Sequence, residues 1–362
     1  MKILFLTLYP ENIASSRLRI YQYRPYLEKV GLSCSIKPIL PKNIFLRFYN
    51  KKETWNRIIF HSAELLNRFK DILNSSFFDL VVVQKGLSSI NFCCFEKLLK
   101  ICKKKIIYDF DDTVFGLTQT LPNYLRFIQD KNQNVEIARI AKLVIAGNSH
   151  LAQLAKQFND SVYVLPTAVD TDVFKLRFTA LKVNKRVTIG WTGSKSTNFY
   201  VNNLLPILNK LSAKYALRFK LISSDLERIQ LNRLSKDIDF EFVPWRQETE
   251  VADLSDIDIG TMPLNFDYRS MGKCGFKALQ FMALGIPTVS TPVGINIEII
   301  QDDVNGFLAL KEEEWISKLA LLIEDQELRK RLGQAGRNTV EEKYSLKVNA
   351  PKFKRLIEEA MG

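Results

Sequence analysis

The chain has 362 residues, of which 46% are hydrophobic and 25% charged, so we expect a globular protein of about two domains. A total of 52 Lys and Arg against 39 Asp and Glu gives a formal net charge of +13, which favours anionic partners such as nucleotides, nucleic acids or an anionic membrane surface. Two histidines and five cysteines without a CxxC pair argue against a zinc site. No apolar run is long enough to cross a bilayer, so any membrane contact is expected to be peripheral.

The opening stretch MKILFLTLYP is too short for the hydrophobic region of a signal peptide and continues as a strand. The cysteines are scattered and odd in number, which is typical of a protein in a reducing compartment. These features predict a cytoplasmic protein, and the positive charge makes the inner face of the membrane a candidate location.

Short β-branched runs alternate with longer amphipathic segments along the chain. The first series of runs is KILFLTL, CSIKPIL, DLVVVQKG, KKKIIYDF, AKLVIAG and SVYVLP. The second series is RVTIGWTG, LRFKLISS, DFEFVPW, DIDIGTMPL, IPTVSTPVG and NGFLAL. Such alternation is typical of parallel strands covered by helices on both faces of a sheet. The predicted fold class is therefore α/β, with two doubly wound, Rossmann-like domains.

The junction between the two series is expected near residues 171–186, which are basic and lack periodicity. We therefore predict an N-terminal domain over residues 1–175 and a C-terminal domain over residues 176–345. Residues 346–362 have an amphipathic pattern with Pro351 near its start, which predicts a short helix. This helix either packs back across the first domain or stays on the second.

In open parallel sheets, ligands bind beyond the carboxyl ends of the strands, so the residues that follow each run are the candidates for a site. The first run is followed by Ser15, Ser16 and Arg17, where the guanidinium group could meet an anionic group. A helix cap explains the two serines equally well.

Residues 41–73 interleave aromatic residues such as Phe45, Phe48 and Trp55 with basic residues such as Arg57. An apolar face beside a basic face is what a helix needs to lie on an anionic membrane. The alternative is a helix that packs on its own sheet and leaves a basic face in solvent.

The run KKKIIYDF leads into three clustered carboxylates, Asp109, Asp111 and Asp112. Such carboxylates repel one another unless a cation, a ligand hydroxyl or an arginine lies opposite them. We predict that Asp111 or Asp112 binds hydroxyl groups or acts as a general base, and helix capping is the alternative. His150 follows a later strand and is a further candidate, although a lone histidine is more often structural.

The second series opens with a strand that ends in GWTGSKSTN. Gly193 lets a phosphate group approach the backbone, and Lys195 can neutralise its charge. Ser194 and Thr197 can cap the following helix. The alternative is an ordinary strand-to-helix turn with a Ser or Thr cap.

A later strand is predicted to end at Gly260, and a helix is predicted from about Lys273 to Leu284. Arg269 and Lys273 would then stand at the N-terminus of this helix, where two cations oppose the helix dipole unless an anion joins them. Their placement predicts a pyrophosphate site. Lys277 lies one turn deeper and could simply be solvated.

The order and spacing of these segments resemble the glycosyltransferase family 4 members of the GT-B fold, particularly a branch of bacterial enzymes of cell-surface polysaccharide assembly. The segments that carry the resemblance are SSRLRIYQYRPYLEKVG, YDFDD, NSHLAQLA, VLPTAVDTDVF, GWTGS, VPW, DIGTMPL, GKCGFKALQFMALGIPTVSTPVG and NGFL. The resemblance implies two Rossmann-like domains that face each other across a cleft. It also implies transfer of a sugar from a nucleotide-sugar donor to a saccharide or lipid-linked saccharide acceptor.

The same resemblance implies retention at the anomeric carbon, assisted by the donor phosphate, so no protein nucleophile is expected. No metal or cofactor is expected either, because a helix N-terminus with Lys and Arg can stabilise the leaving diphosphate and no DxD arrangement is placed to hold a nucleotide. That family typically carries two glutamates eight positions apart, of which the second binds the ribose of the nucleotide. This chain has Gln280 at the second position and Gly272 at the first. Gln280 can still bond to ribose hydroxyls, because its amide offers both donors and acceptors.

On this interpretation the candidate residues fall into three groups. The catalytic candidates are Asp111, Asp112 and Lys273. The donor-binding candidates are Gly193, Ser194, Lys195, Thr197, Arg269, Lys273 and Gln280. The acceptor-side candidates are Ser16, Arg17, Asp109 and His150. The expected partners are the nucleotide-sugar donor, the acceptor and an anionic membrane touched only peripherally.

Three alternatives stay open. A sugar-nucleotide epimerase of the same architecture would use paired carboxylates and a histidine. A non-catalytic nucleotide-sugar-binding protein would fit the loss of the family's glutamates. A nucleic-acid-binding protein would explain the charge, but the sequence contains no recognised module of that kind, so no nucleic acid partner is expected.

Overall fold

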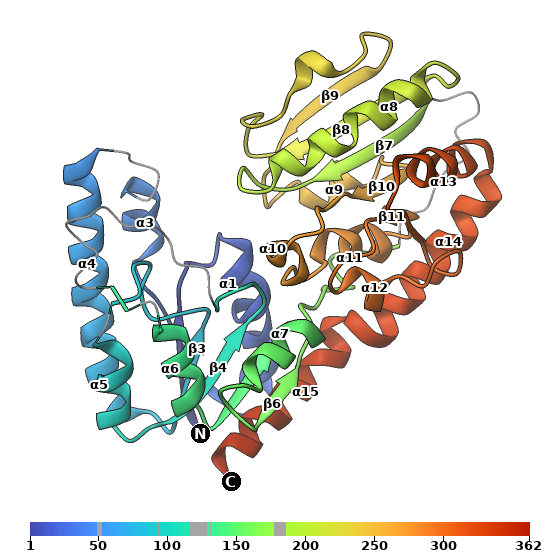
Figure 1. The fold of residues 1–362 in the computed structure, drawn as a ribbon. Helices are drawn as coiled ribbons and strands as arrows, with labels where there is room; N and C mark the ends of the chain where they lie inside the picture. The colour runs from blue at the N-terminus through green and yellow to red at the C-terminus, as the bar shows by residue number, and fades with distance from the viewer. Residues whose placement is uncertain (49–52, 93, 116–128, 131, 177–185) are drawn as a thin grey trace. The chain divides into compact units, whose positions relative to one another are not determined.

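Figure 1 shows the computed structural model of the chain, which describes residues 1–48, 53–92, 94–115, 129–130, 132–176 and 186–362. The chain divides into two compact units. Unit 1 comprises Met1–Ala168, Gly272–Cys274 and Asn349–Gly362, and unit 2 comprises Val169–Met271 and Gly275–Val348. Residues 177–185 of the predicted junction lie outside the described residues.

Unit 1 contains a sheet of six parallel strands in the order β2-β1-β3-β4-β5-β6. The strands are β1 (Lys2–Thr7), β2 (Ser33–Pro38), β3 (Leu80–Gln84), β4 (Lys105–Phe110), β5 (Leu143–Ala146) and β6 (Val162–Val164). The central strands are apolar and buried along most of their length, because helices cover both faces of a sheet of this kind. Each run of the first predicted series therefore forms a strand.

The helices of unit 1 pack on this sheet from two sides. They are α1 (Ala14–Arg19), η1 (Tyr21–Tyr23), α2 (Arg24–Lys29), α3 (Lys42–Phe48), α4 (Thr54–Leu73), η2 (Asn74–Phe77), α5 (Phe95–Ile101), α6 (Gln133–Ile140), α7 (Ser149–Ala155) and the part of α15 (Leu346–Met361) that begins at Asn349. Leu4 and Leu6 of β1 belong to the core that also contains Ile72 of α4. Phe5, which points to the other face, lies 6.4 Å from the ring of Phe353 in α15. Alternation along β1 thus joins helices on both faces to one sheet.

The aromatic stretch predicted to lie on a membrane forms α3 and α4, and its side chains divide differently from the prediction. Phe45 and Phe60 are buried in a small core with Ile39, and the rings of the two phenylalanines lie 5.9 Å apart. The prediction that Phe45 faces lipid is therefore wrong, because this side chain helps to fasten α3 to α4. Trp55, by contrast, is exposed.

Unit 2 contains a second sheet of six parallel strands, in the order β12-β11-β10-β7-β8-β9. The strands are β7 (Val187–Thr192), β8 (Leu217–Ser223), β9 (Asp239–Pro244), β10 (Ile259–Met262), β11 (Thr288–Ser290) and β12 (Phe307–Leu308). The helices are η4 (Asn198–Asn203), α8 (Leu205–Ser212), η5 (Leu231–Arg233), α9 (Glu250–Leu254), α10 (Tyr268–Met271), α11 (Phe276–Ala283), α12 (Asn296–Ile299), α13 (Glu312–Glu324), α14 (Gln326–Thr339) and the π-helical turn η6 (Val340–Tyr344). Trp191, Phe219 and Phe281 are fully buried between these layers.

Candidate functional site

The strand order of each sheet indicates where a ligand binds. Unit 2, taken from β9 to β12, has the 3-2-1-4-5-6 order of the doubly wound dinucleotide-binding fold, and the order reverses between β7 and β10. In unit 1 the first five strands have the 2-1-3-4-5 order, which reverses between β1 and β3. Ligands of such sheets bind outside the carboxyl ends of the strands at the reversal. The residues after β7 and β10, and those after β1 and β3, therefore form the two candidate sites.

The loop after β7 contains the predicted residues Gly193, Ser194 and Thr197. The Thr197 hydroxyl oxygen accepts a hydrogen bond from the Ser194 N–H at 3.1 Å and donates to the Ser194 carbonyl at 3.0 Å. A Cβ atom on Gly193 would lie 2.1 Å from the ring of Trp191 and 2.7 Å from the ammonium nitrogen of Lys277. The loop therefore needs a bare backbone at Gly193, which is the condition for close approach of a phosphate group.

Lys277, in the first turn of α11, brings a positive charge to this loop. Its Nζ donates to the Thr197 hydroxyl at 3.0 Å and lies 4.1 Å from the centroid of the Trp191 ring. Since Trp191 is fully buried, the ring is a fixed platform that positions the ammonium group. The sequence pattern favours Lys273 over Lys277, but the ammonium group beside Gly193 is that of Lys277.

The helix predicted from about Lys273 to Leu284 begins later in the structure, at Phe276. Gly275 adopts a left-handed conformation with φ of 67° and is the N-cap residue of α11. A Cβ atom there would meet Ile299 at 2.4 Å, so only glycine fits this turn. Arg269 consequently lies inside the separate helix α10, where it is exposed, and Lys273 lies in the link that groups with unit 1. The two cations do not share one helix N-terminus.

Gln280 is 3% exposed and is held by a residue that the sequence did not single out. Its amide nitrogen donates to a carboxylate oxygen of Glu250 at 2.9 Å, and the indole N–H of Trp245 donates to the same oxygen at 3.0 Å. Glu250 begins α9, which follows the VPW segment at the end of β9. The position that resembles the family's ribose-binding glutamate therefore has an acidic neighbour within unit 2.

In unit 1, Ser16 connects the loop after β1 to the end of β3. Its hydroxyl group is fully buried, donates to the side-chain carbonyl of Gln84 at 2.8 Å and accepts from the N–H of Tyr9 at 3.2 Å. The N-cap residue of α1 is Ile13, whose side chain makes no capping hydrogen bond, so the serines do not cap this helix. Arg17, the next residue of α1, is partly exposed.

Asp109 has a structural role in the interior of unit 1. Arg19 binds both of its carboxylate oxygens, at 3.1 and 2.5 Å, and donates to the carbonyl of Leu165 at 2.6 Å. Both charged side chains are at most 1% exposed. Burial disfavours the charge of Arg19, but the Asp109 carboxylate outweighs it and raises the pKa of Arg19. The acceptor-side prediction for Asp109 is therefore wrong, because a buried carboxylate paired in this way cannot meet a ligand.

Asp111 and Asp112 lie directly after β4 but in different surroundings. Asp111 is 6% exposed and accepts a hydrogen bond from the Thr167 hydroxyl at 3.1 Å. The side chain of Asp112 is 30% exposed and lies 3.4 Å from the Nζ of Lys85 and 3.2 Å from that of Lys273. Burial opposes the ionisation of Asp112, but Lys85 and Lys273 outweigh it and lower its pKa. Asp112 is thus an ionised carboxylate at the rim of the site.

Lys85 is a residue that the sequence prediction missed. It is the first residue after β3, and its backbone has a left-handed φ of 68°, which is uncommon outside glycine. Burial disfavours its charge, but Tyr9, Asp112 and Asp111 raise the pKa of Lys85. Lys85 could have been predicted, because candidate residues follow the carboxyl end of each strand.

Two further candidates occupy less central positions. His150 lies in the first turn of α7 and is partly exposed, next to Asn148, which caps the helix by accepting from the Leu151 N–H at 2.8 Å. Lys195 forms an ion pair with Glu227 in which both side chains are more than half exposed. Such surface pairs contribute little to stability, so Lys195 can exchange this partner readily.

Comparison with known protein families identifies part of unit 2. Residues 186–325 match the family Glycosyl transferases group 1. The matched segment extends from the start of β7 to the end of α13, so it contains the Gly193 loop, Lys277 and Gln280. No curated protein matches the chain by sequence.

Solved structures similar to this chain cover it almost completely. A glycosyltransferase from Rickettsia africae is 16% identical, with 99% of this chain and 98% of that chain covered and a TM-score of 0.70. HepE from Anabaena, in complex with UDP-glucose, is 16% identical, with coverages of 99% and 100% and a TM-score of 0.65. Sucrose-phosphate synthase from Thermosynechococcus elongatus is 13% identical, with coverages of 99% and 98% and a TM-score of 0.68.

These comparisons confirm the predicted fold class, namely two Rossmann-like domains of the GT-B type, and the matched family agrees with the resemblance of the sequence to glycosyltransferases. Among the described residues, no helix is both long and apolar enough to cross a membrane. In that same part of the chain, no three His, Cys, Asp or Glu side chains are grouped to hold a metal ion.

Replacing Gly193 with Ala is expected to destabilise unit 2 by about 1–3 kcal/mol, because the new methyl group overlaps the buried Trp191 ring. Urea unfolding measures this change. Gly86→Ala is the matched control, since a methyl group at Gly86 would find its nearest neighbour at 3.6 Å. Equal stability of the two variants would contradict the close packing at Gly193.

Replacing Gln280 with Glu is expected to lower the free energy of unfolding by about 2 kcal/mol at neutral pH, because a hydrogen bond to Glu250 becomes a repulsion between carboxylates. Chemical unfolding at neutral pH tests the prediction. The exchange variant Gln280→Glu with Glu250→Gln should recover most of the loss, and a failure to recover would show that the pair is not in direct contact.

Proposed function

We propose that this protein is a glycosyltransferase that moves a sugar from a nucleotide-sugar donor to a saccharide or lipid-linked saccharide acceptor. The observation that carries the proposal is the loop after β7, where Gly193 and the ammonium group of Lys277 lie at the strand-order reversal of a segment that matches a glycosyltransferase family. We assign the donor to this loop in unit 2. The complexes of HepE with UDP and UDP-glucose support uridine nucleotides as the first donors to test.

Transfer of a sugar from a nucleotide requires the departing diphosphate to be stabilised as the glycosidic bond breaks. A fixed cation that meets the developing charge provides this stabilisation, and Lys277, held between Trp191 and Thr197, has the required position beside the loop. We therefore propose that the reaction needs no metal ion. We also propose retention at the anomeric carbon, with the donor phosphate assisting the incoming hydroxyl group.

The acceptor is assigned to the carboxyl edge of the sheet in unit 1. Asp112 is the residue best suited to bind its hydroxyl group, because this carboxylate is ionised, half-buried and flanked by Lys85 and Lys273. We assign Asp111 to positioning, since it is buried and bonded to Thr167. We further propose that the protein belongs to family 4, acts in polysaccharide assembly and works in the cytoplasm at the inner face of the membrane.

The test has two stages. A thermal-shift comparison of UDP, GDP, dTDP, CMP and ADP identifies the base, because a ligand that binds only the folded state raises the melting temperature. The matching nucleotide sugar is then incubated with and without a panel of saccharide and lipid-linked acceptors while nucleotide release is measured. Release that depends on the acceptor supports the transferase. Free sugar in the absence of acceptor favours the epimerase, and binding without turnover favours a non-catalytic protein.

A further inference from the structure

Helix α4 buries charged side chains beside the apolar Phe60 and Ile72. Its buried side carries Glu64, Arg68 and Asp71, which are at most 8% exposed. Arg68 donates hydrogen bonds to three backbone carbonyl groups at 2.7–3.2 Å, and Glu64 accepts from the Ser89 hydroxyl at 2.6 Å. Polar contacts thus join this helix to unit 1 together with the apolar contacts of Phe60 and Ile72.

The opposite side of α4 is apolar and faces solvent. Trp55, Leu66 and Phe77 are 72%, 73% and 74% exposed. The α4 face comprises Trp55, Ile59, Leu66, Phe69, Leu73 and Phe77, all of them exposed. Intervals of three, four and seven residues keep these side chains on one side of the helix and of the short turn η2 that continues it. Because the fold does not bury these side chains, an apolar face of this extent marks an interaction surface.

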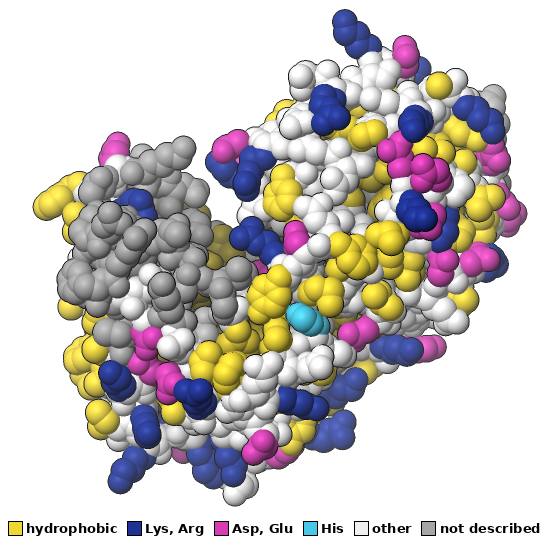
Figure 2. Space-filling view, in the orientation of Figure 1, with side chains coloured by type: hydrophobic (Ala, Val, Ile, Leu, Met, Phe, Trp, Pro, Cys, Tyr) yellow, Lys and Arg dark blue, Asp and Glu magenta, His cyan; other side chains and the backbone are white. Residues whose placement is uncertain are grey.

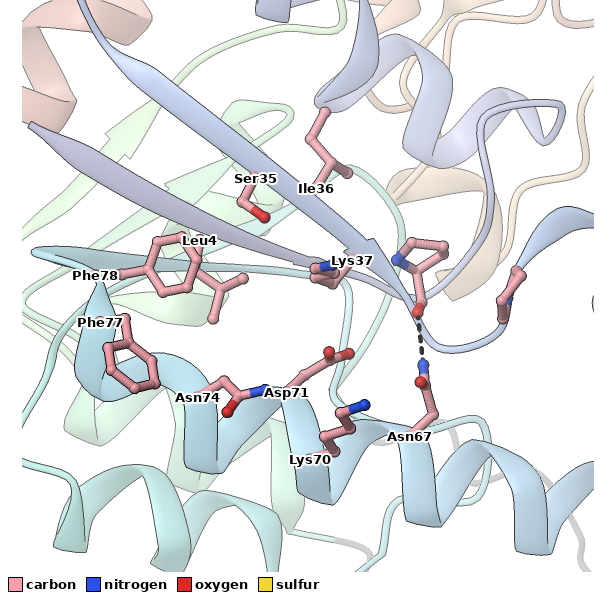
Figure 3. Close-up of a pocket in the computed structure, with 12 residues that line it drawn as sticks. Leu4, Ser35, Ile36, Lys37, Asn67, Lys70, Asp71, Asn74, Phe77 and Phe78 are labelled. Atoms are coloured by element: carbon pink, nitrogen blue, oxygen red, sulfur yellow. Dashed lines mark hydrogen bonds between the residues drawn. The ribbon is translucent and has the colours of Figure 1, made fainter.

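Phe77, at one end of the α4 face, lies between two basic hollows. The first is a groove of about 630 Å³ between β2 and α4, and Figure 3 shows Lys37 and Lys70 on its two sides with Phe77 and Phe78 at its end. The groove also contains Asp71, which lies 3.7 Å from a guanidinium nitrogen of the buried Arg68. The second hollow is lined by Phe77 and Asp79 together with the consecutive lysines 103–105, so its net charge is positive. An exposed aromatic ring flanked by lysines on both sides is therefore built into this edge of unit 1.

The charges around the α4 face are mostly positive. In the described residues between 42 and 105, the exposed basic side chains are Lys42, Arg47, Lys70, Lys97, Lys100, Lys103 and Lys105. The exposed acidic side chains of the same stretch are Glu53 and Asp79. Figure 2 shows hydrophobic side chains along the edge of unit 1 formed by α4, and Lys and Arg side chains gathered near α5. An apolar strip with a cationic border is the pattern that suits an anionic lipid interface.

We propose that unit 1 docks on an anionic lipid surface through the α4 face, with the aromatic and aliphatic side chains in the interface and the bordering lysines at the headgroups. A second copy of the chain fits this surface less well, because a two-fold contact places the same cationic border against itself. The surface differs from the one predicted from the sequence, since Phe45 is buried and the exposed strip extends to Phe77.

The direction of α4 gives the docking a consequence for the acceptor site. The helix of 20 residues is about 30 Å long, and Phe77 is followed closely by the start of β3 at Leu80. The Trp55 end therefore lies toward the carboxyl edge of the sheet, where Ser16 and Lys85 stand. A helix that lies flat on the membrane brings this edge to the lipid. The docking itself does not rest on the proposed function, because it is measured without donor or acceptor.

The experiment is cosedimentation of the full-length protein with vesicles of phosphatidylcholine alone or mixed with phosphatidylglycerol. We expect binding to the anionic vesicles only, and weaker binding as the salt concentration rises. Trp55 supplies a second readout, because Trp191 and Trp315 are buried and Trp245 is partly buried. Its fluorescence should shift to shorter wavelength when anionic vesicles are added.

Matched variants distinguish binding through the α4 face from nonspecific adsorption to vesicles. Leu66→Ser with Phe77→Ser should weaken vesicle binding by about tenfold or more without lowering the melting temperature, because both side chains are in solvent. The control is Leu310→Ser with Leu321→Ser, which removes two leucines of 51% and 48% exposure in unit 2. Lys70→Gln with Lys103→Gln should weaken binding by about fivefold for each lysine, whereas Lys236→Gln with Lys352→Gln, of equal net charge, should not.

Three results would each overturn the proposal. One is equal binding to neutral and anionic vesicles, or none to either. Another is unchanged binding of the Leu66→Ser, Phe77→Ser variant. A third is a concentration-dependent dimer in light scattering that this variant abolishes, which would assign the α4 face to a second copy of the chain.

Discussion

Replacing Lys277 with Ala is expected to weaken the binding of the matching nucleoside diphosphate by about 30-fold, which corresponds to about 2 kcal/mol for a hydrogen bond to a charged group. The reason is that Lys277 is the cation beside the Gly193 loop, 3.0 Å from Thr197 and stacked on the Trp191 ring. The affinity for the nucleoside without phosphates should change little. Isothermal titration calorimetry with the diphosphate and the nucleoside measures both quantities.

The control for this prediction is Lys195→Ala, which removes a cation from the same loop. Lys195 is more than half exposed and paired with Glu227, so its loss should lower the diphosphate affinity by less than about threefold. An equal loss for nucleoside and diphosphate would show that Lys277 supports the loop without meeting phosphate. A larger effect at Lys195 would place the phosphates at the outer side of the loop.

The parallel strands of both units could be predicted because their local pattern is strong. Runs such as DLVVVQKG are β-branched and apolar on both faces, which suits a strand covered by helices on two sides. The order of the strands within each sheet could not be predicted, because pairing joins segments that are distant in sequence. β10 pairs with β7, for example, and the site depends on that reversal.

The candidate site was predicted in outline, and the errors have identifiable physical causes. One left-handed residue, Gly275, separates α10 from α11 and so moves the relevant cation from Lys273 to Lys277. The role of Asp109 depends on Arg19, which lies 90 positions away in sequence. No local sequence pattern predicts a partner at such a distance along the chain. Likewise, the period of α4 indicates an amphipathic helix, but it does not predict that Glu64, Arg68 and Asp71 lie on the buried side.

The acceptor side gives the second large effect, at Asp112. This carboxylate lies between Lys85 and Lys273, whereas its neighbour Asp111 is buried against Thr167. Only Asp112 is therefore both ionised and partly exposed at the end of β4. The two residues were equivalent candidates in the sequence, and their surroundings now distinguish them.

Asp112→Asn is expected to lower kcat by about 10²–10³-fold while leaving the donor affinity unchanged, because the variant keeps the shape of the side chain but loses the charge that binds the acceptor hydroxyl. Asp111→Asn should act mainly on stability.

Since the lysines lower the pKa of Asp112 below its ordinary value, the wild-type carboxylate stays ionised between pH 5 and 8, and its titration should not shape the activity profile in that range. Its contribution to stability is present above the ordinary pKa of Asp and is lost as the pH falls through the lowered value, so wild type and Asp112→Asn should converge in stability only under strongly acidic conditions. Initial rates, donor titrations and acid unfolding of both variants measure these quantities, and normal turnover of Asp112→Asn would remove the carboxylate from the acceptor site.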